Sequence, residues 1–228
     1  MKRFYKDVTI ADDGAILLDG RAVRTPARAK LILPAPALAE AVADEWRAQA
    51  DEIDPRAMAM TGLANAAIDR VAPDPAAFAE PLAAYAETDL LCYRADSPED
   101  LVAAQATAWD PLLDWAQRRY DVHFAVTAGI VHVAQPAATV ARLAEALAGR
   151  DPFALAPLSP LVTIGGSLVA ALALAEGAIG ADEAFAATHL DELWQAEQWG
   201  EDYLATEARE RRRGDFNAAA RFLALLQT

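Results

Sequence analysis

The sequence has few of the residues that most often carry chemistry. A single cysteine, Cys92, and three histidines are spread over 228 residues. One thiol cannot form an internal disulfide and leaves a thiolate metal cluster without ligands, which is typical of a reducing compartment. None of the histidines has a second ligand three or four positions away that forms a recognisable zinc motif. We therefore expect no metal and no cofactor.

Positive charge is scarce as well. Lysine and arginine number 20 against 34 acidic residues, which gives a net charge of -14 at neutral pH. Such a charge repels phosphate backbones and anionic lipid headgroups, so nucleic-acid binding would require a concentrated basic face. The one arginine cluster, Arg209 to Arg213, is predicted to end a helix and to pair with nearby acids. The N-terminus lacks the apolar stretch of a signal peptide. These features predict a cytoplasmic, bacterial protein without a nucleic-acid partner.

The longest segment without a charged residue raises the question of a membrane span. Residues 153–175 contain no charged side chain and are long enough to be considered as a membrane span. However, Ser159-Pro160 is expected to start a helix, a glycine pair weakens the middle, and weakly apolar alanine fills much of the rest. The apolar stretch after the proline is too short to cross a membrane. The segment is therefore predicted to be a buried central helix from Pro160 to Glu176, without stable membrane insertion.

The first 34 residues have the pattern of a small β-rich domain. Short runs of β-branched, aromatic and aliphatic residues at 4–10, 15–18 and 29–33 are separated by turn signals. The pairs Asp13-Gly14 and Asp19-Gly20 favour tight turns, because aspartate and glycine tolerate positive φ. Residues 1–34 are therefore predicted to form a small domain of β-hairpins.

From residue 35 onward the apolar residues recur mostly at helical spacing. Ser97-Pro98 is expected to start a helix with the serine as its cap, and Asp110-Pro111 is expected to break that helix in two. Alternating apolar residues near 122–133 predict a short β-hairpin. The predicted fold class is thus α+β, with a small N-terminal β-domain followed by a larger, mostly α-helical domain at 35–228.

Motifs for catalysis are sparse. The sequence lacks a phosphate-binding loop, because the glycine pair before Ser167 is not followed by lysine. Cys92 is flanked by apolar residues, where a buried and inert thiol is the usual state, although a nucleophilic role stays open. We predict no catalytic residue and no enzyme. The alternative is a small-molecule enzyme of unknown reaction that uses a carboxylate or Cys92.

The segment from Asp191 to Asp202 is rich in both acids and tryptophan. At helical spacing, large apolar residues and acids are presented together. Paired carboxylates can perform acid-base chemistry, a solvated acidic face is the commoner use, and tryptophan anchors beside charges are typical of protein interfaces. The pattern leaves these three uses open.

The sequence also resembles a known family, the ATP12 chaperones of F1-ATPase assembly. The segments that carry the resemblance occur in the family's order over nearly the whole chain. They are Arg3-Phe4-Tyr5-Lys6, Leu18-Asp19-Gly20-Arg21 with Thr25-Pro26, Glu45-Trp46-Arg47-Ala48-Gln49, Thr88-Asp89-Leu90-Leu91-Cys92-Tyr93-Arg94, Trp109-Asp110-Pro111, Gly166-Ser167-Leu168, and Gln195 with Trp199-Gly200.

The resemblance implies an assembly chaperone of the proton-transporting ATP synthase that binds the free F1 α subunit. Such a chaperone prevents aggregation of the α subunit until β subunits dock, and eukaryotic relatives act in the mitochondrial matrix. We expect the free protein to be a monomer. The resemblance implies a partner-binding site on the acidic helix, at Asp191 or one position on at Glu192. Trp194 and Trp199 are predicted to contribute to the same site.

Overall fold

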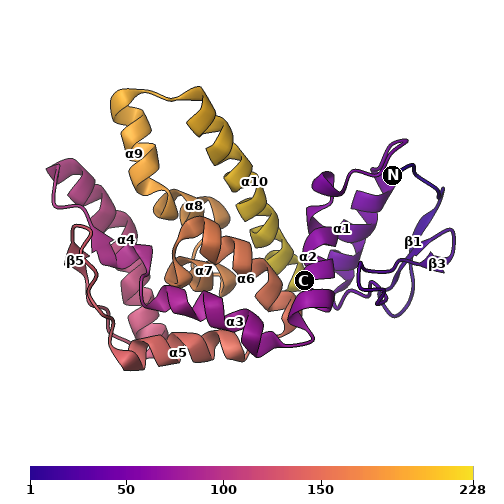
Figure 1. The fold of residues 1–228 in the computed structure, drawn as a ribbon, viewed down its shortest axis with the longest axis horizontal. Helices are drawn as coiled ribbons and strands as arrows, with labels where there is room; N and C mark the ends of the chain where they lie inside the picture. The colour runs from indigo at the N-terminus through magenta and orange to yellow at the C-terminus, as the bar shows by residue number, and fades with distance from the viewer. Residues whose placement is uncertain (228) are drawn as a thin grey trace. The chain divides into compact units, whose positions relative to one another are not determined.

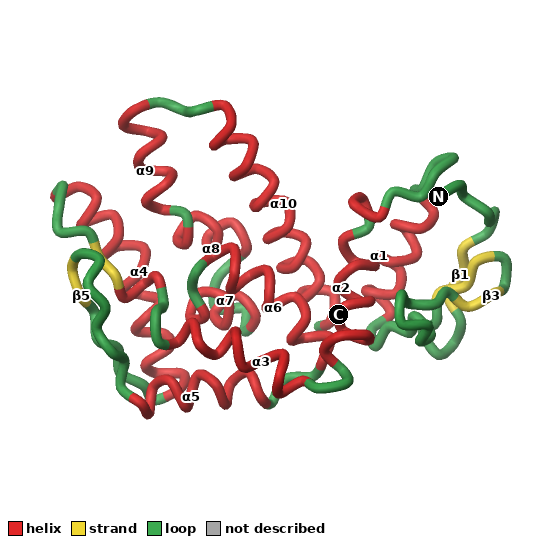
Figure 2. The backbone as a smooth tube through the Cα atoms, viewed as in Figure 1, coloured by secondary structure: helices red, strands yellow, loops and turns green. Residues whose placement is uncertain are grey.

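The chain is an α+β protein, as predicted (Figure 1, Figure 2). A computed structural model describes residues 1–227. The strands are β1 Val8–Ile10, β2 Ile16–Leu18, β3 Arg21–Ala22, β4 Tyr93–Arg94 and β5 Thr127–Ala128. The α-helices are α1 Pro36–Arg47, α2 Ala59–Ala66, α3 Pro75–Ala83, α4 Glu99–Tyr120, α5 Ala137–Ala148, α6 Pro152–Gly165, α7 Leu168–Ala175, α8 Ala181–Thr188, α9 Leu190–Trp199 and α10 Tyr203–Leu226. Shorter 3-10 or π segments are η1 Pro55–Ala57, η2 Ala67–Val71, η3 Ala84–Ala86 and η4 Leu90–Cys92.

The chain packs as two compact units. The first contains Met1–Phe78, Asp151–Pro157 and the residues from Ala218 on, and the second contains Ala79–Arg150 and Leu158–Asn217. The expected domain boundary at residue 34 therefore differs from this division. The reason is that α1 and α2 contribute fully buried side chains to the same core as the strands, so helix and sheet complete one another.

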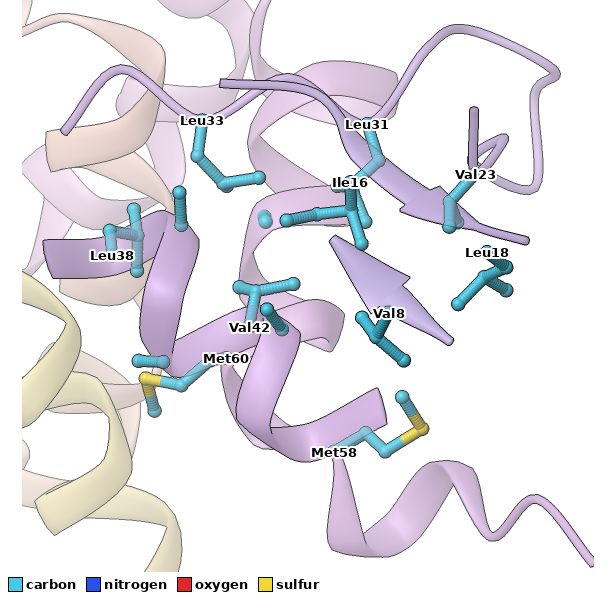
Figure 3. Packing of buried hydrophobic residues seen from close by; sticks show 14 of the residues in the cluster. Val8, Ile16, Leu18, Val23, Leu31, Leu33, Leu38, Val42, Met58 and Met60 are labelled. Carbon is cyan, nitrogen blue, oxygen red and sulfur yellow. The ribbon is translucent and has the colours of Figure 1, made fainter. Parts of the chain in front are cut away.

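The first unit is built on a three-stranded antiparallel sheet in the order β1-β2-β3. Asp19 and Gly20 join β2 to β3 with φ angles of 48° and 76°, the left-handed pair that a tight two-residue hairpin requires. Figure 3 shows side chains from the sheet and from α1 meeting in the core, among them Ile16 and Val42, both fully buried. The predicted strand at 29–33 does not form a strand of the sheet; it forms isolated bridges, and Leu31 accepts a hydrogen bond from the N–H of Ile16 in β2.

The second unit is helical, and its longest helix differs from the sequence prediction. Helix α4 continues through Pro111 instead of breaking there. Proline inside a helix costs about 3 kcal/mol, but one face of α4 is buried on both sides of Pro111, from Leu101 to Ala116. Burial of this face compensates for the missing hydrogen bond. Ser97 does not cap the helix, because the residue at the cap position is Pro98.

The prediction of a single central helix from Pro160 to Glu176 was also wrong. Pro160 lies inside α6, and the chain turns between α6 and α7 at Gly166, whose φ is +67°. The side chain of Ser167 then accepts a hydrogen bond from the N–H of Ala170 at 3.0 Å and so begins α7. Within residues 1–227, the structure contains no helix that is both long and apolar enough to span a membrane.

The predicted hairpin near residues 122–133 is absent from this region of the described chain. Instead, β5 pairs in parallel with β4, with Tyr93 opposite Thr127 and Arg94 opposite Ala128. Alternation of apolar residues indicates extended backbone but does not identify the partner strand. The pairing partner here comes from before α4, which a local pattern could not show.

Candidate partner-binding surface

An open groove lies in the second unit, where α4 packs against α8 and α9. It encloses about 550 Å³, and its lining is mostly apolar. The three helices can be followed in Figure 1. The lining residues are Ala104, Thr107, Ala108, Pro111, Leu112, Trp115, Ala178, Ile179, Glu183, Ala186, Ala187, Leu190, Leu193, Trp194 and Glu197.

The groove follows from two helical stripes in the sequence. On α4, Ala104, Ala108 and Trp115 recur near multiples of the helical repeat and so share one face. On α9, Leu193 and Trp194 face the same space. Because small side chains lie between large ones, the surface is hollowed instead of flat.

A buried hydrogen bond fixes α4 against α8 beneath the groove. The Nε1–H of Trp109, which is fully buried, donates to the carbonyl oxygen of Ala187 at 2.7 Å. Arg94 lies over the Trp109 ring, with its guanidinium carbon 5.2 Å from the ring centroid. Trp109 therefore positions a residue of the groove lining without itself lining the groove.

The exposed ring of Trp199 continues the apolar surface beyond the groove, and two further exposed apolar residues follow it in the chain. Trp199 is 75% exposed, and Tyr203 and Leu204, at the start of α10, are 78% and 70% exposed. The rings of Trp194 and Trp199 meet edge to face with centroids 5.8 Å apart. Trp194 lines the groove and touches Trp199, so the apolar surface runs from the groove to the end of α9. Exposed apolar patches of this kind commonly mark interaction surfaces.

The two predicted acids lie in a different place from Trp194. Asp191 and Glu192 line a second cavity of about 310 Å³ and do not line the groove. Asp191 accepts a hydrogen bond from the side-chain amide of Gln105 at 2.7 Å, while Glu192 pairs with Arg212 at 2.6 Å. Both carboxylates thus have partners within the chain. The structure brings Trp194 and Trp199 together and places the acids on another side of α9.

The arginine run lies within α10 and does not end it, which corrects the sequence prediction. Its pairing with acids is as expected. Arg209 is buried and pairs with Glu201 at 2.8 Å, and Arg213 pairs with Asp182 at 3.0 Å. These ion pairs join the first half of α10 to its neighbours in the second unit.

Cys92 lacks the properties of a nucleophile. It is fully buried, and burial raises the pKa of its thiol to about 12, with the negative charge of Asp89 adding to the effect. At neutral pH the thiol therefore stays protonated, whereas a nucleophilic cysteine needs the thiolate. Burial also raises the pKa of Asp89 to about 6. Its carboxylate accepts hydrogen bonds from the N–H groups of Leu91 and Val169, so its contacts are structural.

His189 also has structural surroundings. His189 is buried, its ring stacks on Phe185 with centroids 3.9 Å apart, and burial lowers its pKa. Within residues 1–227, no group of three or more His, Cys, Asp or Glu residues is arranged to hold a metal ion.

Sequence reasoning missed Gln105 and Glu183. Gln105 is almost fully buried, and its amide joins the N–H of Ala95 to the carboxylate of Asp191. A polar residue at an apolar position of the α4 stripe was the available signal. Glu183 lines the groove from the first turn of α8. From the sequence, an acid in the first turn of a helix is explained by its favourable interaction with the helix N-terminus. That explanation does not point to a groove.

The fold and the groove define an α+β protein that presents a wide, mostly apolar surface with exposed aromatic residues. Residues 2–117 match the family described as ATP12 chaperone protein. The chain belongs to this family.

Solved structures extend the likeness over the whole chain. The crystal structure of Atp12 from Paracoccus denitrificans is 43% identical, with a TM-score of 0.92, and the match covers 99% of this chain and 98% of that one. A mutant of the Paracoccus protein has the same identity and a TM-score of 0.93, covering 99% and 97%. A putative chaperone from Agrobacterium tumefaciens is 45% identical with a TM-score of 0.92, covering 99% and 86%. These relatives support a role as an assembly chaperone.

Proposed function

We propose that this protein binds the free α subunit of the F1 sector of ATP synthase and prevents its aggregation until β subunits dock. Membership in the ATP12 chaperone family supports the proposal. The structural observation that carries it is the apolar surface that continues from the groove to Trp199. A surface of this kind suits a partner that itself exposes apolar area.

The physical reasoning concerns the unassembled subunit. A subunit separated from its neighbours exposes an apolar interface, and that interface drives self-association. A protein that covers the interface lowers the concentration of the aggregation-prone form by mass action. Such a binder needs no catalytic residue, and the buried, protonated thiol of Cys92 argues against the alternative of an enzyme that uses this cysteine.

Within this proposal the four predicted residues have different roles. Trp194 and Trp199 contact the α subunit, since one lines the groove and the other is exposed. Asp191 and Glu192 act close by on α9, where their contacts with Gln105 and Arg212 orient the helix. The free protein is proposed to be a cytoplasmic monomer.

The test is to mix the purified chain with isolated F1 α subunit in the absence of ATP. We expect a complex on gel filtration and suppression of α-subunit light scattering at stoichiometric amounts. An unrelated protein of similar negative charge is the control. Failure to form a complex, or equal protection by the control protein, would show that the proposal is wrong.

A further inference from the structure

Two carboxylates at the groove have no cationic partner. Glu183 and Glu197 line the groove and are exposed, and within residues 1–227 neither has a Lys, Arg or His nitrogen within 4.0 Å. Their neighbours differ. Asp182 pairs with Arg213 at 3.0 Å, and Glu192 pairs with Arg212 at 2.6 Å. Among the acids of α8 and α9, Asp191 accepts from Gln105 while Glu183 and Glu197, which line the groove, have no ion pair within residues 1–227.

The shape of the groove favours a helix as its occupant. Ala104, Ala108 and Ala186 contribute small side chains, while Trp115 and Trp194 are large and half-buried. The lining comes from helices and from one turn before α8, so it offers no sheet edge to an extended segment. An extended strand would leave its backbone N–H and C=O groups without partners there, whereas a helix satisfies its own.

We propose that the groove binds a short amphipathic helix of the client protein. The apolar face of that helix packs on the alanines and between the tryptophans, and its lysine or arginine side chains pair with Glu183 and Glu197. The net charge of -14 favours the approach of a basic segment. This inference rests on the proposed function, because the client that supplies the helix is the free α subunit.

The first experiment uses two labelled peptides and does not depend on the client. Both are amphipathic helices of leucine and alanine, one with lysine and the other with glutamate on the polar face. Fluorescence anisotropy measures their binding to the full chain at low salt. We expect the lysine peptide to bind at least about tenfold more tightly than the glutamate peptide. Equal binding of the two peptides would overturn the inference.

Variants then locate the peptide. Ala186→Trp fills the groove at an exposed position, and we expect it to weaken binding of the lysine peptide by about tenfold or more. Ala141→Trp, at an exposed position of α5 outside the groove, is the matched control and should leave binding unchanged. Equal affinities of the two variants would contradict the placement.

The charge preference is tested separately. The double variant Glu183→Gln with Glu197→Gln keeps the size of both side chains and removes both charges. We expect it to bind the lysine and glutamate peptides within about threefold of each other. Glu210→Gln, exposed on α10 and outside the groove, should keep the full preference. A preference that survives the double variant would show that other charges select the peptide.

The protection assay with isolated α subunit separates this inference from the proposed function. If the wild-type chain and Ala186→Trp protect isolated α subunit equally, the groove inference is wrong and the proposed function stands. If the lysine peptide binds in the groove but the wild-type chain does not retain the α subunit, the proposed function fails and the preference of the groove stands. Loss of α-subunit protection by Ala186→Trp but not by Ala141→Trp supports both.

Discussion

Replacing Asp89 by asparagine should change how the stability of the protein depends on pH. Asp89 is fully buried, and burial raises the pKa of its carboxyl from 3.8 to about 6, against the opposing hydrogen bonds from Val169 and Leu91. The folded state therefore holds the proton more tightly than the unfolded state does. The favourable contribution is complete below pH 3.8 and is lost as pH rises through 6.

The size of the effect follows from the two pKa values. The difference corresponds to about 3 kcal/mol of unfolding free energy between the limits of low and high pH. About half of this, roughly 1.5 kcal/mol, develops between pH 5 and pH 8. Asparagine cannot ionise, so the Asp89→Asn variant lacks this loss. Its amide nitrogen also leaves one backbone N–H without an acceptor, but that penalty, about 1–3 kcal/mol, does not depend on pH.

The assay is urea unfolding of both proteins between pH 5 and pH 8. The unfolding free energy of Asp89→Asn, relative to that of the wild type, should rise by roughly 1.5 kcal/mol over this range. Asp114→Asn, at an exposed position of α4, measures the background change. A difference that is constant with pH, or that falls as pH rises, would refute the reasoning. It would show that the hydrogen bonds to the carboxylate balance or outweigh its burial.

Substitutions at three further positions test other parts of the account. Asp191→Lys should weaken protection of the α subunit in the light-scattering assay, while its far-UV circular dichroism spectrum stays unchanged. Asp191→Asn keeps an acceptor for Gln105 and should weaken protection less. An unfolded Asp191→Lys variant would show that the acid is structural. Trp109→Phe should lower the unfolding free energy by about 1–3 kcal/mol, since it leaves the carbonyl of Ala187 unpaired, and a urea-derived loss under about 0.5 kcal/mol would contradict this. Gly14→Ala should lower the thermal midpoint in calorimetry, because φ is +80° and the added methyl would collide with a backbone carbonyl oxygen; an unchanged midpoint would show that the turn adapts.

Local chemistry made parts of the fold predictable. The Asp19-Gly20 turn could be predicted because its positive φ angles depend only on the two residues themselves. Helix α1 was expected from apolar residues repeating on one face. The continuation of α4 through Pro111 was not expected, because it depends on burial of one face of the helix on both sides of the proline. The sequence also predicted a helix start at Pro160, whereas Pro160 lies inside α6 and the chain turns at Gly166.

The candidate site was less predictable than the fold. The sequence identified an acidic, tryptophan-rich helix, and that helix does line the groove through Trp194. The opposite wall comes from α4, and the contact between Gln105 and Asp191 joins positions 86 residues apart. No local pattern shows which helix faces α9, so the groove, and the separation of Asp191 from Trp194, required the structure.

Hydrogen exchange of the chain with and without isolated α subunit tests the central claim most directly. The claim is that the client contacts the groove of the helical unit. We predict slower amide exchange on binding at Ala104 to Trp115 of α4 and at Glu183 to Trp199 of α8 and α9, with the β1-β2-β3 sheet unchanged. Slower exchange confined to the sheet, with the groove segments unchanged, would contradict the account.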